Sequence, residues 1–93
     1  MDKISVVVPC YNEEEALPVY YKEMCRVMDE MKDVVFELIF VDDGSKDSAP
    51  QIIDEYAHKY PQKVKAFHKT NGGEFTTRNY GLERATGEYV TFV

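Results

Sequence analysis

The 93-residue sequence predicts an α/β fold in which one parallel sheet is covered by helices on both faces. Two observations carry this prediction. Apolar, β-branched stretches alternate along the chain with stretches of helical spacing, and the connections between them are a few residues long. The stretches at 4–9 and 36–41 are apolar at nearly every position, which is typical of parallel strands buried on both sides. The expected architecture is Rossmann-like, with right-handed crossovers.

The first helix is predicted to run from about residue 12 to residue 32. Asn12 and Glu15 have the spacing of a capping box, and apolar residues then recur every three or four positions. The residues expected to face inward are Leu17, Tyr20, Met24, Val27, Met28 and Met31. Asp47 or Ser48 is expected to cap a second helix, which Pro61 ends.

A short third strand is expected at 64–68, before the turn Asn71-Gly72-Gly73. The third helix is predicted from about residue 74 to residue 86, and residues 88–93 form the fourth strand. Its inward residues are expected to be Phe75, Leu82 and Ala85, with Gly87 at the C′ position.

Gly81 falls inside the predicted third helix. A glycine there costs roughly 1 kcal/mol relative to alanine. Close packing or a close ligand is therefore expected at this position.

Composition narrows the function classes. The net charge is -6 and no run of Lys or Arg is present, which argues against a nucleic-acid or anionic-membrane surface. Cys10 and Cys25 form neither a disulfide framework nor a C-x-x-C pair, so a reducing compartment is expected. The sequence contains no apolar stretch of about 18 residues. The expected location is cytoplasmic, and any association with the inner face of a membrane would come from parts outside this chain.

The expected strand order, third-second-first-fourth, places a crevice at the carboxyl ends of the first and fourth strands. Segments 9–12, 42–45 and 71–73 would converge there, together with whatever follows Val93. Asp42 and Asp43 end the second strand and point to opposite faces, so one is expected to look into the crevice. The alternative is that both acids cap the turn and face water, since Asp-Gly pairs mark turns for local reasons.

No Gly-rich phosphate fingerprint is present, neither G-x-G-x-x-G nor G-x-x-x-x-G-K-[ST]. A nucleotide in this crevice would need side-chain contacts: Tyr11 for the base to stack on, Asp43 to accept its N–H, and a cation for the pyrophosphate. Arg78 is a candidate partner for phosphate or carboxylate. The alternative for Arg78 is an ion pair with Glu74 within the helix.

Four blocks in order resemble the opening of a family 2 glycosyltransferase of the GT-A type. They are residues 4–13, residues 41–47, the turn 71–73 with residues 77–82, and residues 85–90. The resemblance implies an inverting transferase that uses a nucleotide-sugar donor, commonly a UDP-sugar, and a divalent cation, Mn or Mg.

The resemblance also implies site residues. Pro9 and Tyr11 would line the nucleotide pocket, and Glu13 would approach the ribose or base. Asp43 would accept from the base N–H and Asp42 would support the loop. Arg78 would lie near the phosphates or the acidic metal site.

In this family the strand equivalent to residues 88–93 runs into an acidic D-x-D-type motif that holds the metal. A catalytic carboxylate comes much later in the chain. Neither motif occurs in residues 1–93, so the metal ligands are expected beyond Val93. The expectation is that residues 1–93 are the nucleotide-sugar-binding N-terminal part of a single glycosyltransferase domain, truncated at its C-terminal end and inactive alone, with no catalytic residue of its own.

Two other classes stay open: a non-catalytic nucleotide-binding or regulatory domain, and a phospho-acceptor receiver domain. Receivers carry their paired acids after the first strand, where this chain has Cys10-Tyr11-Asn12. For a transferase, the turn at 71–73 resembles enzymes of cell-surface polysaccharide assembly, whereas residues 11–18 resemble enzymes that act on polyprenyl phosphate. The acceptor is expected to be a glycan or a lipid-linked molecule.

Overall fold

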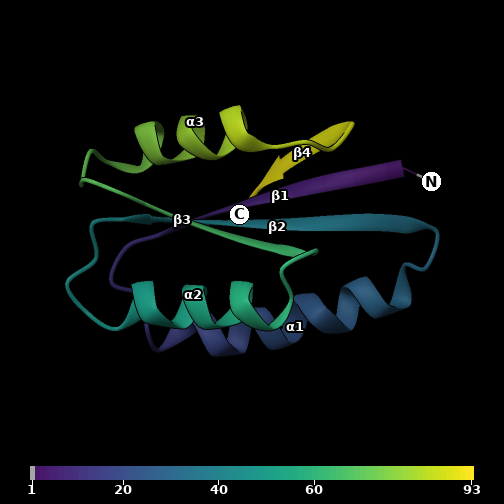
Figure 1. The fold of residues 1–93 in the computed structure, drawn as a ribbon, viewed down its shortest axis with the longest axis horizontal. Helices are drawn as coiled ribbons and strands as arrows, with labels where there is room; N and C mark the ends of the chain where they lie inside the picture. The colour runs from purple at the N-terminus through teal and green to yellow at the C-terminus, as the bar shows by residue number, and fades with distance from the viewer. Residues whose placement is uncertain (1) are drawn as a thin grey trace.

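The computed structural model describes residues 2–93, which form a four-stranded parallel sheet with three helices (Figure 1). In chain order the elements are β1 (Asp2–Cys10), α1 (Ala16–Glu30), β2 (Val34–Asp43), α2 (Ala49–Lys59), β3 (Val64–Lys69), α3 (Glu74–Arg84) and β4 (Tyr89–Phe92). The strand order is β3-β2-β1-β4. The predicted fold class, element order and strand order are confirmed.

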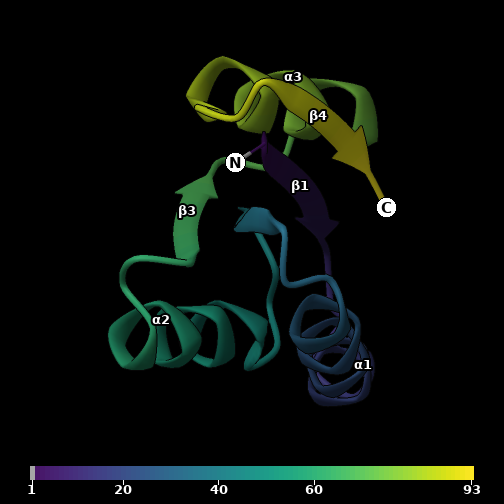
Figure 2. The same ribbon diagram turned by 90° about the vertical axis from the view of Figure 1, so that its right-hand side faces the viewer.

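The helices lie on both faces of the sheet: α1 and α2 cover one face and α3 covers the other (Figures 1 and 2). Alternate residues of β2 serve the two faces. Leu38 and Phe40 pack with Leu17 of α1 and Ile53 of α2, whereas Ile39 and Val41 face α3. Because both faces are buried, nearly every residue of the strand is apolar.

Helix α3 lies close to the sheet at Gly81. A Cβ atom added there would stand 2.4 Å from Cγ1 of Val7 and 3.3 Å from Cγ2 of Val41. These distances leave no room for a methyl group. Of the two explanations that the sequence left open, close packing and a close ligand, close packing is the one observed.

The predicted capping box at Asn12 and Glu15 is wrong. Helix α1 begins at Ala16 after Glu15, without a hydrogen bond from a capping side chain. Asn12 instead takes the left-handed conformation, with φ of 52°, and its side chain binds a different loop. The helix ends at Glu30, which leaves Met31 exposed rather than inward. Within residues 2–93, no helix combines the length and apolar character that crossing a bilayer requires.

Helix α2 begins after Ser48, whose side chain makes no capping hydrogen bond. The Asp47 carboxylate accepts the Ala49 N–H at 2.9 Å. Of the two predicted capping residues, Asp47 is therefore the one that binds the helix start.

The predicted inward face of α3 is partly wrong. Phe75 is 78% exposed and Leu82 is 46% exposed, whereas Thr77 and Gly81 are buried. Gly87 is not the C′ residue either, because the helix ends at Arg84 and Ala85 is already extended. The small residues face the sheet because α3 lies too close to it for large ones.

Candidate functional site

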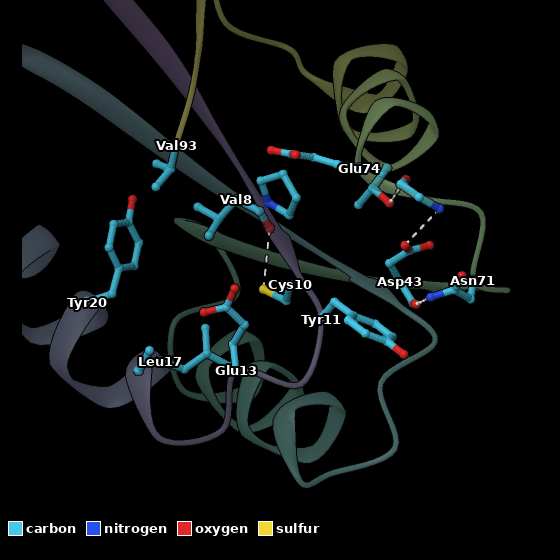
Figure 3. Close-up of a pocket in the computed structure, with 14 residues that line it drawn as sticks. Val8, Cys10, Tyr11, Glu13, Leu17, Tyr20, Asp43, Asn71, Glu74 and Val93 are labelled. Carbon is cyan, nitrogen blue, oxygen red and sulfur yellow. Dashed lines mark hydrogen bonds between the residues drawn. The ribbon is translucent and has the colours of Figure 1, made fainter.

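A cleft of about 730 Å³ opens at the carboxyl ends of β1 and β2, beside the start of α3 (Figure 3). Its walls come from the segments that the sequence predicted to converge. The lining residues are Val8, Pro9, Cys10, Tyr11, Glu13, Ala16, Leu17, Tyr20, Asp43, Asn71, Gly73, Glu74, Thr77 and Val93. The volume is within the range of small-molecule sites in proteins.

The loop after β1 is held by the loop after β2. The Asn12 N–H donates to Ser45 Oγ at 2.9 Å, and the Lys46 N–H donates to Asn12 Oδ1 at 2.9 Å. This reciprocal pair stabilises the left-handed Asn12, a conformation that asparagine tolerates better than most residues.

A second reciprocal pair joins the same loops at the starts of α1 and α2. The Glu14 N–H donates to Asp47 Oδ2 at 3.1 Å, and the Ser48 N–H donates to Glu14 Oε2 at 3.0 Å. Both carboxylates thereby satisfy free amides near helix starts, where the helix dipole favours negative charge. Glu13, between Asn12 and Glu14, and Tyr11, directly before Asn12, are thus held at the cleft.

Asp42 and Asp43 point to opposite faces of the sheet, as strand geometry requires. Asp42 Oδ1 accepts the Ser45 N–H at 3.2 Å, and Oδ2 lies 3.7 Å from Nδ1 of His68. The other nitrogen of His68 lies 2.7 Å from Asp54 of α2. Asp42 therefore supports the loop after β2 from the α2 side, and Asp43 is the acid that lines the cleft.

Asp43 is 5% exposed and accepts three hydrogen bonds through its carboxylate. Oδ1 accepts from Lys69 Nζ at 2.8 Å and from the Gly72 N–H at 2.9 Å, and Oδ2 accepts from the Gly73 N–H at 3.0 Å. Burial alone would raise the pKa of Asp43, but these donors outweigh burial and hold the pKa below its ordinary value. The side chain is an anion at neutral pH.

The turn at 71–73 is pressed against the end of β2. Asn71 Nδ2 donates to the Asp43 carbonyl oxygen at 2.9 Å (Figure 3). A Cβ atom at Gly44 would meet the Asn71 backbone nitrogen at 2.9 Å, and the φ of 72° at Gly44 also favours glycine. Gly44 is therefore part of a tight turn, and Asp43 before it lines the cleft. The alternative in which both acids face water is wrong, because Asp42 and Asp43 are both buried.

Arg78 does not line the cleft. Its Nη2 lies 3.0 Å from Glu74 Oε1, and its guanidinium lies 5.8 Å from the centroid of the Phe92 ring. Of the two alternatives for Arg78, the intrahelical pair is the one observed. Glu74, the acidic partner, faces the cleft.

Four of the six predicted binding residues thus meet at one cleft: Pro9, Tyr11, Glu13 and Asp43. Asp42 and Arg78 are not among the residues that line the cleft. The sequence analysis missed Tyr20 as a lining residue, because its spacing marked it only as part of an apolar stripe. Its hydroxyl oxygen is buried and has no hydrogen-bond partner within residues 2–93.

Cys10 belongs to the segment 9–12 that was predicted to reach the crevice, and it also lines the cleft, although it was not predicted to be a binding residue. Burial, together with the nearby Glu13, Asp42 and Asp47, raises the pKa of its thiol to about 12. The thiol is therefore neutral at physiological pH and is a poor nucleophile.

Residues 2–93 contain no group of three or more His, Cys, Asp or Glu side chains arranged to hold a metal ion. The buried acids are also engaged elsewhere, Asp43 by Lys69 and Asp42 by the Ser45 amide. The part of the chain that the structure describes therefore does not fit a divalent cation as a resident group.

Comparison with known proteins gives the family. The sequence matches the model of "Glycosyl transferase family 2" over residues 5–93. The chain belongs to this family. The prophage bactoprenol glucosyl transferase homolog of Escherichia coli is 41% identical over 88 residues, which are 95% of this chain and 28% of that protein. The poly(ribitol-phosphate) β-N-acetylglucosaminyltransferase TarS of Staphylococcus aureus is 36% identical over 93 residues, which are 100% of this chain and 16% of TarS.

Solved structures agree with the fold. The structure of S. aureus TarS 1–349 in complex with UDP-GlcNAc superposes with a TM-score of 0.82 at 36% identity, covering 98% of this chain and 26% of that one. The mannosyltransferase PcManGT from Pyrobaculum calidifontis, in complex with GDP-Man and Mn²⁺, has a TM-score of 0.71 at 26% identity, covering 96% of this chain and 26% of that one. The Rossmann-like GT-A fold is confirmed. The chain thus spans between about a sixth and little more than a quarter of the length of these curated relatives, 16% of TarS and 28% of the glucosyl transferase homolog.

Proposed function

We propose that the cleft binds the nucleoside diphosphate of a sugar donor, with UDP-sugar as the favoured donor. The observation that carries this proposal is Asp43, a buried carboxylate held as an anion in the wall of a nucleotide-sized cleft. The similarity to TarS, crystallised with UDP-GlcNAc and with UDP, supports the same function.

A carboxylate accepts hydrogen bonds and donates none. Uracil and guanine present a ring N–H on their pairing edge, whereas cytosine and adenine present an unprotonated ring nitrogen at the equivalent place. An anionic Asp43 that faces this ring position is therefore complementary to uracil and guanine, and the lone pair on the ring nitrogen of cytosine or adenine repels it. Sites that depend on such a hydrogen bond reject analogues that lack the donor.

Calorimetric titration of the chain with UDP, GDP, CDP and ADP tests the proposal. UDP is expected to bind, and at least about tenfold more tightly than CDP, because one charge-assisted hydrogen bond contributes roughly 1.5–3 kcal/mol. Equal affinity for all four nucleotides would show that only the phosphates are bound. No binding by any of them would refute the nucleotide function.

For the acceptor, we propose a glycan or lipid-linked molecule in the synthesis of cell-surface polysaccharide. A polyprenyl-phosphate acceptor is the second candidate, and the identity of 41–42% with bactoprenol glucosyl transferases supports it. A location in a reducing, cytoplasmic compartment belongs to the same proposal, since Cys10 and Cys25 are both free thiols. The acceptor test supplies the full-length enzyme with labelled UDP-sugars and either polyprenyl phosphate or a glycan, and measures which acceptor takes up label.

We further propose that the transfer proceeds with inversion and depends on residues outside these 93. In an inverting displacement, a general base takes the proton of the acceptor hydroxyl as that oxygen attacks the anomeric carbon and the nucleoside diphosphate leaves. The role of residues 1–93 is to bind and orient the donor, while the base and the ligands of any Mn or Mg ion lie elsewhere. Sugar transfer by the purified 93-residue chain would contradict this division of roles.

A further inference from the structure

Lys69 is the last residue of β3 and lies beside Asp43 in the register of the sheet. Its side chain is only 14% exposed. The ammonium group donates to Asp43 Oδ1 at 2.8 Å, to the Thr70 carbonyl at 2.8 Å and to Thr76 Oγ1 at 3.3 Å. An ammonium group has three protons, so each proton has an acceptor within the protein. A lysine used in this way is fixed in position.

The hydrogen bonds divide the two oxygens of Asp43 unequally. Oδ1 accepts from both Lys69 and Gly72, whereas Oδ2 accepts from Gly73 alone. A carboxylate has about four acceptor sites, so Oδ2 keeps the greater free capacity. Lys69 therefore binds Oδ1, which also accepts from the Gly72 amide, and leaves Oδ2 available to a ligand.

The same lysine also holds the start of α3. Thr76, which accepts from Lys69, donates its hydroxyl to the Gly73 carbonyl at 2.9 Å. Gly73 has a φ of 94° and precedes the first residue of α3. The end of β3, the turn at 71–73 and the first turn of α3 are thus joined at one ammonium group.

We propose that Lys69 is a positioning residue for nucleotide recognition, which locks the Asp43 carboxylate to the turn at 71–73 and presents Oδ2 as an anionic acceptor for a ring N–H of the base. The inference rests on the proposed nucleotide function. Lys69 acts through Asp43 and does not itself contact the ligand. Within residues 2–93, Asp43 forms an ion pair with Lys69 alone.

Other titratable groups surround the same space. Those that line the cleft are Cys10, Tyr11 and Glu13 from β1 and the loop after it, Tyr20 from α1, and Glu74 from α3. Arg78 pairs with Glu74, and Asp42 and His68 lie on the opposite face of the sheet. The test must therefore follow the carboxyl group of Asp43 itself.

The experiment compares Lys69→Met with Lys69→Arg and with Lys65→Met. Lys65 lies on the same strand but donates to the Pro61 carbonyl, so it is a matched control. UDP affinity is measured by calorimetry from pH 5 to pH 8, and the ionisation of Asp43 in the free protein is followed by carboxyl ¹³C NMR. Circular dichroism shows whether each variant is folded.

The wild type, Lys65→Met and Lys69→Arg are expected to bind UDP with one common pH profile, in which the ionisation of the terminal phosphate of UDP is the same for all three. Relative to this profile, Lys69→Met should lose about tenfold in affinity between pH 7 and pH 5, because an Asp43 without its cation takes up a proton as the pH falls. The NMR titration of Lys69→Met should show Asp43 titrating at higher pH than in the wild type.

The inference is overturned if the UDP affinity of Lys69→Met follows the wild-type pH profile. It is overturned as well if the UDP affinity falls by the same factor at every pH, which is the result expected of a purely structural lysine. It is also overturned if Lys69→Met is folded and Asp43 titrates as in the wild type. If the wild type fails to bind UDP, the proposed function fails, and with it any role for Lys69 at a nucleotide. The NMR result would then show separately whether Lys69 sets the charge of Asp43.

Discussion

Two of the buried acids of strand β2 have opposite uses: Glu37 near the start of the strand and Asp43 at its end. They are six positions apart, an even number, so both side chains point to the α3 face of the sheet. Glu37 is 4% exposed and Asp43 is 5% exposed. Hydrogen bonds hold the pKa of each below its ordinary value despite burial.

Both carboxylate oxygens of Glu37 are fully engaged by groups of the chain itself. Oε1 accepts from Ser5 Oγ at 2.9 Å and from the Thr86 N–H at 3.1 Å. Oε2 accepts from Thr86 Oγ1 at 3.0 Å and lies 3.7 Å from Lys3 Nζ. This network fixes the connection between α3 and β4 at the end of the sheet far from the cleft.

The two acids differ in how much hydrogen-bond acceptor capacity their carboxylate oxygens keep free. Glu37 has two partners on each oxygen, whereas Asp43 has one on Oδ2 and lines the cleft. Burial and a lowered pKa are common to both, so neither property distinguishes a structural acid from a binding acid. Free acceptor capacity beside a cavity does distinguish them.

The largest expected effect is that of Glu37→Ala. The substitution leaves the buried Ser5 hydroxyl without its acceptor, and it removes the two hydrogen bonds that hold the exposed Thr86 to β2. The free energy of unfolding should fall by about 2–4 kcal/mol, measured by urea denaturation. A loss below about 1 kcal/mol would mean that water or neighbouring groups replace the carboxylate, and the network would not be the structural element described above.

A smaller effect is expected from Gly81→Ala in α3, the helix that follows the turn beside Asp43 and precedes Thr86, the partner of Glu37. The new methyl group meets Val7 and Val41 and must push α3 away from the sheet. Overpacking costs about 1–3 kcal/mol, against a gain of up to about 1 kcal/mol in helix propensity. Urea denaturation should show net destabilisation, whereas Glu83→Ala, on an exposed position of α3, should be nearly neutral. Equal stability of both variants would argue against tight packing.

The smallest expected effect is on the pH dependence of stability. Both acids have a folded-state pKa below their ordinary values of 4.5 for Glu37 and 3.8 for Asp43. Their contributions are complete above those values and are lost as the pH falls through the lower folded-state values. Stability should therefore be level above about pH 5 and decline below it. Glu37→Gln should be less stable at pH 7 and should decline less steeply in acid, measured by urea denaturation at each pH. An unchanged slope would show that other groups cause the acid decline.

The sequence predicted those features that depend on local period and chain direction. Strand alternation separated Asp42 from Asp43, and parallel connections brought Pro9, Tyr11 and Asp43 to one edge of the sheet. Strand alternation and parallel connections follow from backbone geometry, which does not depend on the hydrogen-bond partners of individual side chains.

The errors arose where distant residues decide the structure. Asn12 has the local sequence of a capping residue, but Ser45 and Lys46, more than 30 positions away, bind it instead. Phe75 was expected inside because it is apolar, yet the closeness of α3 to the sheet reserves that face for Thr77 and Gly81. The pairing of Asp43 with Lys69, 26 positions apart, has no signature in the sequence.

The most direct test compares Asp43→Asn with Glu37→Gln in calorimetric titrations with UDP. Each substitution removes one buried negative charge from the same strand and face, so each controls for the other. Asp43→Asn should weaken UDP binding by about 1–3 kcal/mol, because one acceptor oxygen becomes a donor that faces the ring N–H. Glu37→Gln should bind UDP like the wild type, provided the titration is run under conditions where it is folded. Unchanged UDP affinity in Asp43→Asn, or an equal loss in both variants, would contradict the assignment of Asp43 as the acid that recognises the donor base.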